Sequence, residues 1–255
     1  MKQSILDTLA FSKQIIISPD MDGFVSAQLL NRFNGSKIVG TYDKNILCLA
    51  DDVNPDDCLF VDCDMNRQNY VSLGNHMRLL NDNMSVESFN PNVHFGVATY
   101  SDKFPYATAF LISFATEVQT SDSDLIRMAY ADSTLKNMES YSDNMINWSK
   151  RMEHPAVKYI TDNSDIAKAN DVQARFDYIQ QSFTSKRYGK DRYIQTLNKA
   201  FEEQGVDFEP LTTGKKYMCD KVGINTVIRY NKDIISYAEI FGGEYSVTYD
   251  QEVDW

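Results

Sequence analysis

Short apolar runs alternate with segments of helical periodicity along the first part of the chain. The run Ile15-Ile16-Ile17 is apolar at every position, which is typical of a parallel strand buried on both faces. The strands predicted in this part cover residues 14–18, 37–40, 58–62 and 70–73. The predicted helices begin near Phe24 and cover residues 107–118 and 123–130. This alternation predicts an α/β fold in which a parallel sheet carries helices on both faces.

The pattern changes near residue 155, where helices come first and short strands follow. The helices predicted there cover residues 166–183 and 191–204, and Gly205 is placed to end the second one. The strands predicted after them cover residues 223–230, 234–241 and 244–249, with a Gly-Gly hairpin turn between the last two. We therefore expect two domains, an α/β domain over residues 1–155 and a smaller α+β domain over residues 156–255.

The charge balance limits the partners that the chain is expected to bind. Its 255 residues include 36 acidic and 25 basic ones, a net charge of −11, whereas binding to long duplex nucleic acid normally requires a basic face. Cations, a small nucleotide or a short oligonucleotide remain suitable. The sequence has no CxxC pair, no apolar run of membrane-spanning length and no signal-peptide pattern at its N-terminus. It therefore predicts a cytoplasmic protein without a membrane partner, and it leaves the oligomeric state open.

Acidic residues follow two of the predicted strands at their carboxyl ends. Asp20 and Asp22 come just after the first strand, and Gly23 allows a tight turn into the next helix. Asp62 ends a second strand, and His76 follows a third. The carboxyl ends of parallel strands meet at one edge of a sheet, so these side chains are expected to converge around a divalent cation. The competing interpretation is that they are solvated loop residues, one of which caps the helix.

The order of these motifs resembles that of the DHH phosphoesterase superfamily, which includes RecJ-type exonucleases, nanoRNases and family II inorganic pyrophosphatases. Pro19-Asp20-Met21-Asp22-Gly23 matches the first motif of the superfamily, and Asp62 matches the aspartate of its second strand. Asn75-His76-Met77 resembles the Asp-His-His triplet with only the central histidine kept, and Ala131-Asp132-Ser133-Thr134 resembles the last motif. The resemblance covers residues 14–145.

The resemblance implies a centre of two divalent ions, with Mn²⁺ expected and Mg²⁺ as the alternative. Asp20 and Asp22 would each bind one ion, and Asp62 would bridge them. His76 and Asp132 would complete the two sites. Asp62 and His76 are the expected catalytic residues, because a water activated between the ions would attack phosphorus. The implied reaction is hydrolysis of a phosphodiester or phosphoanhydride in a small nucleotide or a short oligonucleotide.

Three further residues are candidates for substrate binding. Lys103 precedes a helix that begins after Phe-Pro, so its charge and the helix N-terminus are suited to a phosphate. Asn75 and Arg78 lie beside His76 in the sequence. For Lys103, the competing interpretation is a surface lysine beside a packed aromatic turn.

Two other functions also fit parts of the pattern. The Asp-His-His triplet has lost two of its residues, and Ile16 and Ser18 stand where the superfamily often has a further ligand. A catalytically inactive domain that binds a nucleotide or another protein would explain these losses. A strand followed by DxDG is also typical of haloacid-dehalogenase-like phosphatases, in which Asp20 would be the nucleophile and Asp22 the general acid.

Overall fold

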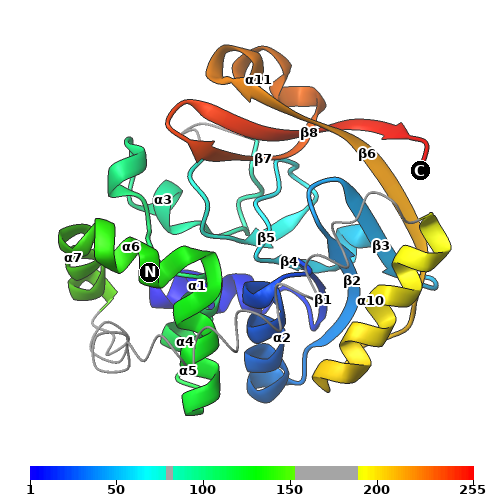
Figure 1. The fold of residues 1–255 in the computed structure, drawn as a ribbon, viewed down its shortest axis with the longest axis horizontal. Coiled ribbons are helices and arrows are strands. Elements are labelled where there is room, and N and C mark those ends of the chain that lie inside the picture. The colour runs from blue at the N-terminus through cyan, green and yellow to red at the C-terminus, as the bar shows by residue number, and fades with distance from the viewer. Residues whose placement is uncertain (79–82, 153–188) are drawn as a thin grey trace.

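The computed structural model describes residues 1–78, 83–152 and 189–255, and Figure 1 shows its arrangement. The strands are β1 (Gln14–Ile17), β2 (Lys37–Tyr42), β3 (Ile46–Ala50), β4 (Leu59–Val61), β5 (Val71–Leu73), β6 (Leu211–Gly223), β7 (Ile234–Phe241) and β8 (Glu244–Val253). The α-helices are α1 (Lys2–Leu9), α2 (Met21–Asn34), α3 (Pro91–His94), α4 (Thr108–Thr116), α5 (Asp122–Tyr130), α6 (Thr134–Ser140), α7 (Ser142–Met152), α10 (Lys190–Gln204) and α11 (Ile224–Tyr230). None of the helices in the described ranges combines the length and the apolar character needed to cross a bilayer.

The strands of the described residues form one mixed sheet in the order β5-β4-β1-β2-β3-β6-β8-β7. Its first four members run parallel, and they are the four strands that the sequence predicts in this part. From β2 onward each neighbouring pair is antiparallel. Helices α2, α4, α5 and α10 occupy the predicted positions. The α/β class is therefore confirmed.

The central strand β1 supplies the core on both faces of the sheet. Ile15 and Ile17 belong to the larger apolar cluster, together with residues of α1, α2, α4 and α10. Ile16 points to the other face and belongs to a second cluster. All three isoleucines are fully buried, and each such burial stabilises the fold by roughly 1.5–3 kcal/mol. The alternation therefore anchors β1, whose carboxyl end carries the first acidic motif.

Helices do not cover both faces of the parallel strands in the described part of the chain. The second cluster, on the face of Ile16, contains strand and loop residues, and Ile235 of β7 and Tyr217 of β6 pack into it. In Figure 1 the C-terminal strands β7 and β8 lie above the parallel strands, and the helices α2, α4 and α5 lie below them. Among the described residues, the long antiparallel extension of the sheet supplies the cover on this second face, where the sequence predicts helices.

The C-terminal part differs from its prediction in two places. Residues 223–230 are predicted as a strand, but Ile224–Tyr230 form α11, in which Val227 is buried and Ile228 is 63% exposed. Strands β3 and β6 are absent from the prediction, and their pairing continues the N-terminal sheet into the C-terminal part. The predicted helix over residues 166–183 lies outside the described residues. The division into two domains stays a prediction.

Strand β7 is attached to the loops that leave the parallel strands. The amide of Asn66, after β4, donates to the carbonyl of Ile235 at 2.6 Å. The amide of Glu239 donates to the carbonyl of Met77, after β5, at 3.0 Å. These bonds bring the edge of β7 to the carboxyl ends of β4 and β5, where the acidic residues lie.

Candidate metal centre

The first acidic segment turns tightly from strand into helix. Asp20 is the N-cap of α2, and its carboxylate accepts a hydrogen bond from the Gly23 amide at 3.1 Å. The Ser18 hydroxyl donates to the other oxygen of Asp20 at 2.6 Å. A Cβ added to Gly23 would lie 1.9 Å from the Ser18 carbonyl oxygen, so only glycine permits this close approach. The turn fixes Asp20 and carries Asp22 into the first turn of the helix.

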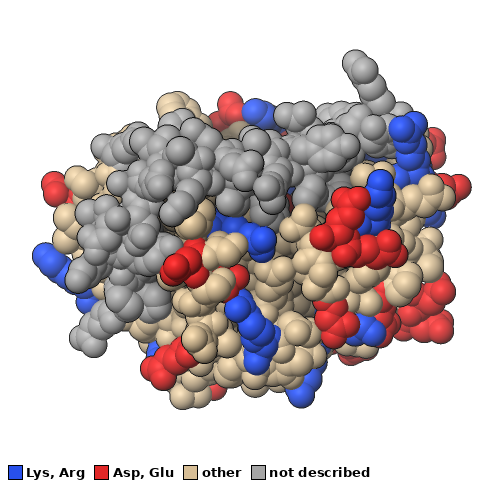
Figure 2. Space-filling model, turned by 60° about the horizontal axis from the view of Figure 1, so that its bottom comes forward, with Lys and Arg blue, Asp and Glu red and all other residues tan. Residues whose placement is uncertain are grey.

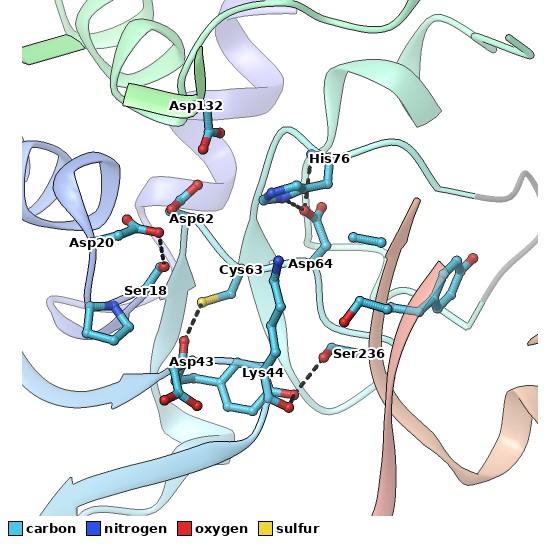
Figure 3. Close-up of a pocket in the computed structure, with 15 residues that line it drawn as sticks. Ser18, Asp20, Asp43, Lys44, Asp62, Cys63, Asp64, His76, Asp132 and Ser236 are labelled. Carbon is cyan, nitrogen blue, oxygen red and sulfur yellow. Dashed lines mark hydrogen bonds and ion pairs between the residues drawn. The ribbon is translucent and has the colours of Figure 1, made fainter. Parts of the chain in front are cut away.

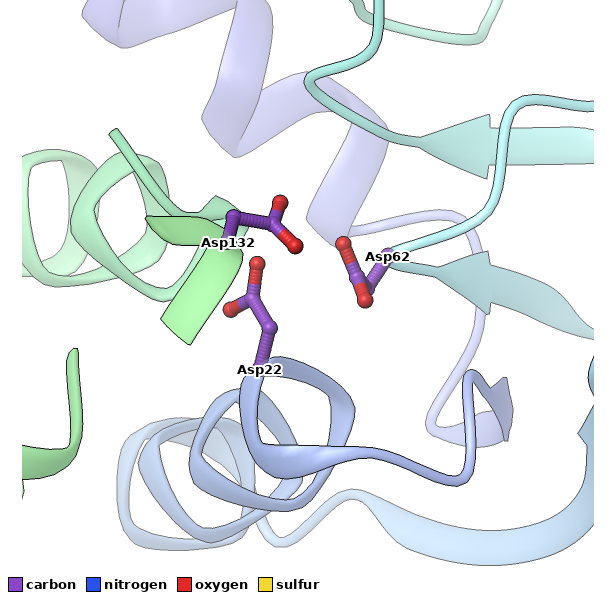
Figure 4. Close-up of side chains that lie close together, drawn as sticks. All are labelled: Asp22, Asp62 and Asp132. Atoms are coloured by element: carbon purple, nitrogen blue, oxygen red, sulfur yellow. The ribbon is translucent and has the colours of Figure 1, made fainter. Parts of the chain in front are cut away.

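Asp22, Asp62 and Asp132 come together as a three-carboxylate cluster, which Figure 4 shows. One carboxylate oxygen of each lies within 4.8 Å of one oxygen of each of the others. Asp22 and Asp62 are buried, whereas Asp132 is exposed. They come from the start of α2, the end of β4 and the turn between α5 and α6. The structure thus brings together three of the residues that the sequence singles out as metal ligands.

The N-terminus of α4 holds Asp22. The backbone amides of Thr108 and Ala109 donate to its two carboxylate oxygens at 2.6 and 2.9 Å, and the Ser26 hydroxyl donates at 3.3 Å. The positive end of a helix favours a negative charge at this position. The helix N-terminus that the sequence suggests for a phosphate is therefore occupied by a carboxylate of the protein itself.

Thr108 also fixes Asp62. Its hydroxyl donates to Asp62 Oδ1 at 2.9 Å while its backbone amide holds Asp22. Asp62 adopts a left-handed backbone with φ 57°, which costs a non-glycine residue on the order of 1–2 kcal/mol. Its amide donates to the Leu73 carbonyl of β5 at 2.8 Å, which supports this conformation. One buried threonine therefore sets the spacing of two carboxylates.

Asn75 positions the third carboxylate. Its side-chain amide donates to Asp132 and, at 2.9 Å, to the Tyr106 carbonyl. Asp132 also has a left-handed backbone, with φ 51°. The Asn75 carbonyl oxygen Oδ1 is buried and has no hydrogen-bond partner among the described residues. An unsatisfied acceptor on the group that holds Asp132 is the kind of atom that a cation or an ordered water satisfies.

Burial and mutual repulsion make the cluster unfavourable for negative charge alone. The pKa values of Asp22 and Asp62 lie well above their ordinary value, mainly because both side chains are removed from water. The neighbouring aspartates, Asp132 and Asp20 among them, raise these pKa values further. The amides at the start of α4 offset only part of this for Asp22. Protons or a cation must therefore compensate the charge.

A pocket of about 310 Å³ opens beside the cluster, as Figure 3 shows. Asp20, Asp62 and Asp132 line one side of it. The turn between β2 and β3 and the strands β7 and β8 form the others. Asp22 does not line the pocket, because the contacts with α4 hold it behind the wall. The cluster is thus open to a ligand from one side.

His76 lines the same pocket but does not belong to the three-carboxylate cluster. Its Nδ1 lies 2.8 Å from Asp64 Oδ2, and its backbone amide donates to the same oxygen at 3.1 Å. Burial raises the pKa of Asp64, but contacts with His76 and the charge of Arg78 outweigh it and hold the pKa below its usual value. A carboxylate on Nδ1 directs Nε2 outward, as in histidines that serve metals or substrates. In Figure 3 the ring points toward the side that holds Asp62.

The sequence-based candidates for substrate binding do not meet at the pocket. Arg78 is buried, lies over the Tyr237 ring at 4.8 Å and donates to Asn66. Lys103 lies over the Tyr100 ring and donates to its hydroxyl at 3.3 Å. Asn75 is buried and holds Asp132. None of these three residues lines the pocket.

Asp64 and Lys44 also line the pocket, although neither is among the site residues that the sequence predicts. Asp64 follows Asp62 by two residues, so the repeated acid at a strand end is the signal that points to it. Lys44 lies in a turn between two strands of which only the first is predicted. Nothing in its local sequence separates it from other surface lysines.

The donors of the cluster fit a hard divalent cation. All of them are carboxylate oxygens, which suit Mg²⁺, Mn²⁺ or Ca²⁺ better than softer metals. The unpartnered Asn75 oxygen adds a further oxygen on a neighbouring side chain. The raised pKa values of the two buried aspartates indicate that the site lacks enough positive charge of its own.

Comparisons of the chain with protein-family models, with curated proteins and with solved structures find no match.

Replacing Thr108 by valine should weaken Mn²⁺ binding about 10- to 100-fold, because Asp62 loses the hydroxyl that orients it. The backbone amide that holds Asp22 is unaffected by this change. Isothermal titration with Mn²⁺ measures the effect. Thr108→Ser keeps the hydroxyl and should bind Mn²⁺ nearly as well as the wild type. Equal affinities for the valine variant and the wild type would show that Thr108 does not position Asp62.

Proposed function

We propose that the protein is a metal-dependent phosphoesterase that hydrolyses a phosphodiester or phosphoanhydride bond in a small phosphorylated molecule such as a nucleotide. The observation that carries this proposal is the cluster of Asp22, Asp62 and Asp132 at the wall of a pocket. When bound there, a divalent cation would supply Lewis acidity, which makes water a nucleophile at neutral pH and offsets charge on phosphoryl oxygens. The resemblance to the DHH superfamily in the order of the motifs supports the same reaction class.

The residues of the chain would contribute preorganisation and proton transfer. Asp22 and Asp62 are held by the start of α4 before any ligand arrives, so little reorganisation is needed on binding. His76 is fixed through Nδ1 by Asp64, which leaves Nε2 to give a proton to the leaving oxygen. This assignment retains Asp62 and His76 as the two residues nearest to the reaction, with Asp22 and Asp132 as further ligands.

The contacts of Asp22 do not favour the haloacid-dehalogenase-like alternative. A general acid must reach the leaving oxygen, but both oxygens of Asp22 accept hydrogen bonds from backbone amides. Asp22 also does not line the pocket. The Asp20 carboxylate, the nucleophile of that mechanism, caps α2 and accepts from Ser18. Asp22 is therefore not placed to act as the general acid of the haloacid-dehalogenase-like mechanism.

Turnover with and without Mn²⁺ tests the proposal, on bis-p-nitrophenyl phosphate, pyrophosphate and a short RNA. Asp132→Asn should lower the Mn²⁺-dependent rate at least about 100-fold, because it removes a charged ligand from an exposed position without unfolding the core. Asp52→Asn is a matched control, since Asp52 is also exposed and also has a left-handed backbone, with φ 59°. Mn²⁺ binding without turnover on any of these compounds would identify the domain as an inactive binding module instead.

A further inference from the structure

We propose that Lys44 binds the phosphoryl group of the ligand, so that the anion lies between this ammonium group and the cation held by the aspartates. The inference rests on the proposed function, because it assigns the anion that the metal centre would act on. Figure 3 shows the side chain of Lys44 extending from the turn between β2 and β3 into the pocket.

Lys44 is the only lysine or arginine among the described residues that line the pocket. The same lining includes Asp20, Asp62, Asp64 and Asp132. A pocket lined by more carboxylates than positive side chains repels a phosphate. Even with one divalent cation bound, the negative charges of the carboxylates would outnumber the positive charges of the cation. A positive side chain that reaches the phosphoryl oxygens is therefore needed to bind an anionic ligand.

The turn that carries Lys44 is held in place by contacts on both sides of the residue. The Asp43 carboxylate accepts from the amides of Asn45 and Ile46 at 3.0 and 2.7 Å. The carbonyl of Lys44 accepts from the hydroxyls of Tyr42 and Thr248. These contacts maintain a left-handed backbone at Lys44, with φ 73°. A long side chain is thus presented from a fixed base, which lowers the entropy lost on binding.

Left-handed backbone conformations concentrate at this pocket. Five non-glycine residues of the described chain have positive φ, and Lys44, Asp62 and Asp132 are three of them. All three line the pocket. Such conformations cost energy and are found preferentially at functional sites. Lys44 shares this property with the two cluster aspartates that line the pocket.

The ammonium group of Lys44 makes no hydrogen bond or ion pair with any other described residue, and Figure 3 draws none to the residues around it. Some surface lysines of the described chain pair with acids, as Lys2 does with Glu117 and Lys37 with Glu209. Lys44 stands among carboxylates without contacting one. The geometry leaves room between them for an anion.

The pocket suits a small ligand better than the interior of a polymer. Its volume of about 310 Å³ lies at the lower end of the range for small-molecule sites. Strand β7 closes one side, because its backbone is bonded to the loops at Asn66 and Met77. On the face that Figure 2 shows, the Lys and Arg of the described residues are interspersed with Asp and Glu and form no continuous basic track. A terminal phosphoryl group of a mononucleotide-sized molecule is therefore the expected occupant.

Calorimetric titration of the full chain tests this assignment, first with Mn²⁺ alone and then with pyrophosphate and AMP at saturating Mn²⁺. Lys44→Gln should weaken binding of both phosphates about tenfold while Mn²⁺ binds as tightly as before or tighter, since a positive charge near the cation is removed. Lys44→Arg keeps the charge and should stay within about threefold of the wild type. Lys103→Gln, outside the pocket, should change neither affinity.

The outcomes separate this inference from the proposed function. Normal Mn²⁺ binding with equal phosphate affinity in wild type and Lys44→Gln would overturn the role of Lys44 and leave the metal centre intact. Phosphate binding that depends on Lys44, without any Mn²⁺ binding, would support the role of Lys44 in phosphate binding and would refute the metal-dependent mechanism. Absence of both kinds of binding in the wild type would overturn both proposals.

Discussion

Asp62→Asn should stabilise the protein in the absence of metal and abolish its stabilisation by Mn²⁺. The Asp62 carboxylate is buried among other aspartates, so its charge is a cost that a neutral amide of the same shape avoids. Asparagine tolerates the left-handed backbone of this position and still accepts from the Thr108 hydroxyl. We expect a gain on the order of 1–2 kcal/mol in the unfolding free energy at pH 8.

The sign of this effect depends on pH in a defined way. The pKa of Asp62 is raised in the folded state, so folding binds protons between the ordinary carboxyl pKa of 3.8 and the folded value. The stability that this proton contributes is fully present below 3.8 and is lost as the pH rises through the folded pKa. Asp22 behaves in the same way. The metal-free wild type should therefore lose stability relative to Asp62→Asn as the pH rises from mildly acidic to 8.

Mn²⁺ should reverse the order of the two proteins. At a concentration of a hundred times its dissociation constant, a ligand stabilises the folded state by about 2.7 kcal/mol, and only the wild type should gain this. Urea unfolding at pH 5 and pH 8, with and without Mn²⁺, measures all four conditions. Asp124→Asn is a control for which we expect the opposite change, a loss of stability. Asp124 is buried, but an ion pair with Arg32 at 2.9 Å lowers its pKa overall. An Asp62→Asn protein that is destabilised without metal would refute the account of the cluster.

Gly23→Ala should destabilise the protein by about 3 kcal/mol or more and remove Mn²⁺ binding. The added Cβ would lie 1.9 Å from the Ser18 carbonyl oxygen and 2.9 Å from its carbon. Both are backbone atoms, so no side chain can rotate away to relieve the clash. The gain of about 1 kcal/mol from replacing glycine by alanine in a helix is smaller than this strain. The start of α2 must move, and Asp20 and Asp22 move with it.

Two other glycines provide a graded control for Gly23. Gly35, the C-cap of α2, has φ 76° and no atom within 4 Å of an added Cβ, so alanine should cost on the order of 1 kcal/mol there. Gly223 has φ −80° and equally open surroundings, and alanine should change the stability by less than about 0.5 kcal/mol. Thermal unfolding of the three alanine variants measures the order of their stabilities. A Gly23→Ala protein as stable as Gly223→Ala would show that the turn is less tight than described.

The parallel part of the fold could be predicted because its strands are buried on both faces, so that successive residues are apolar. Ile15, Ile16 and Ile17 are apolar since both faces of β1 are covered, and a strand of this kind is readily recognised. The convergence of Asp22 and Asp62 follows from the same geometry, since residues after parallel strands meet at one edge. Only the order of the motifs predicts Asp132 as a ligand, and the structure brings it to the same place.

The antiparallel extension could not be predicted, because its strands are defined by pairing more than by burial. In β6, Thr212, Thr213 and Lys215 are exposed, so its pattern carries no clear period. Conversely, the apolar residues of α11 suggest a strand, since a short run with Val227 and Ile228 does not distinguish the two structures. Contacts such as that between Asp64 and His76, or the position of Lys44, depend on side chains meeting across the fold. They require the tertiary structure.

The proposed function requires the three aspartates to hold a divalent cation at the wall of the pocket. Anomalous diffraction at the manganese edge from crystals grown with Mn²⁺ tests it most directly, because it locates the ion without reference to activity. We predict a peak within coordination distance of Asp62 and of Asp22 or Asp132, and no such peak in Asp62→Asn. A wild-type map without a peak at the cluster, in crystals that contain Mn²⁺ well above millimolar concentration, would show that the aspartates do not hold the cation.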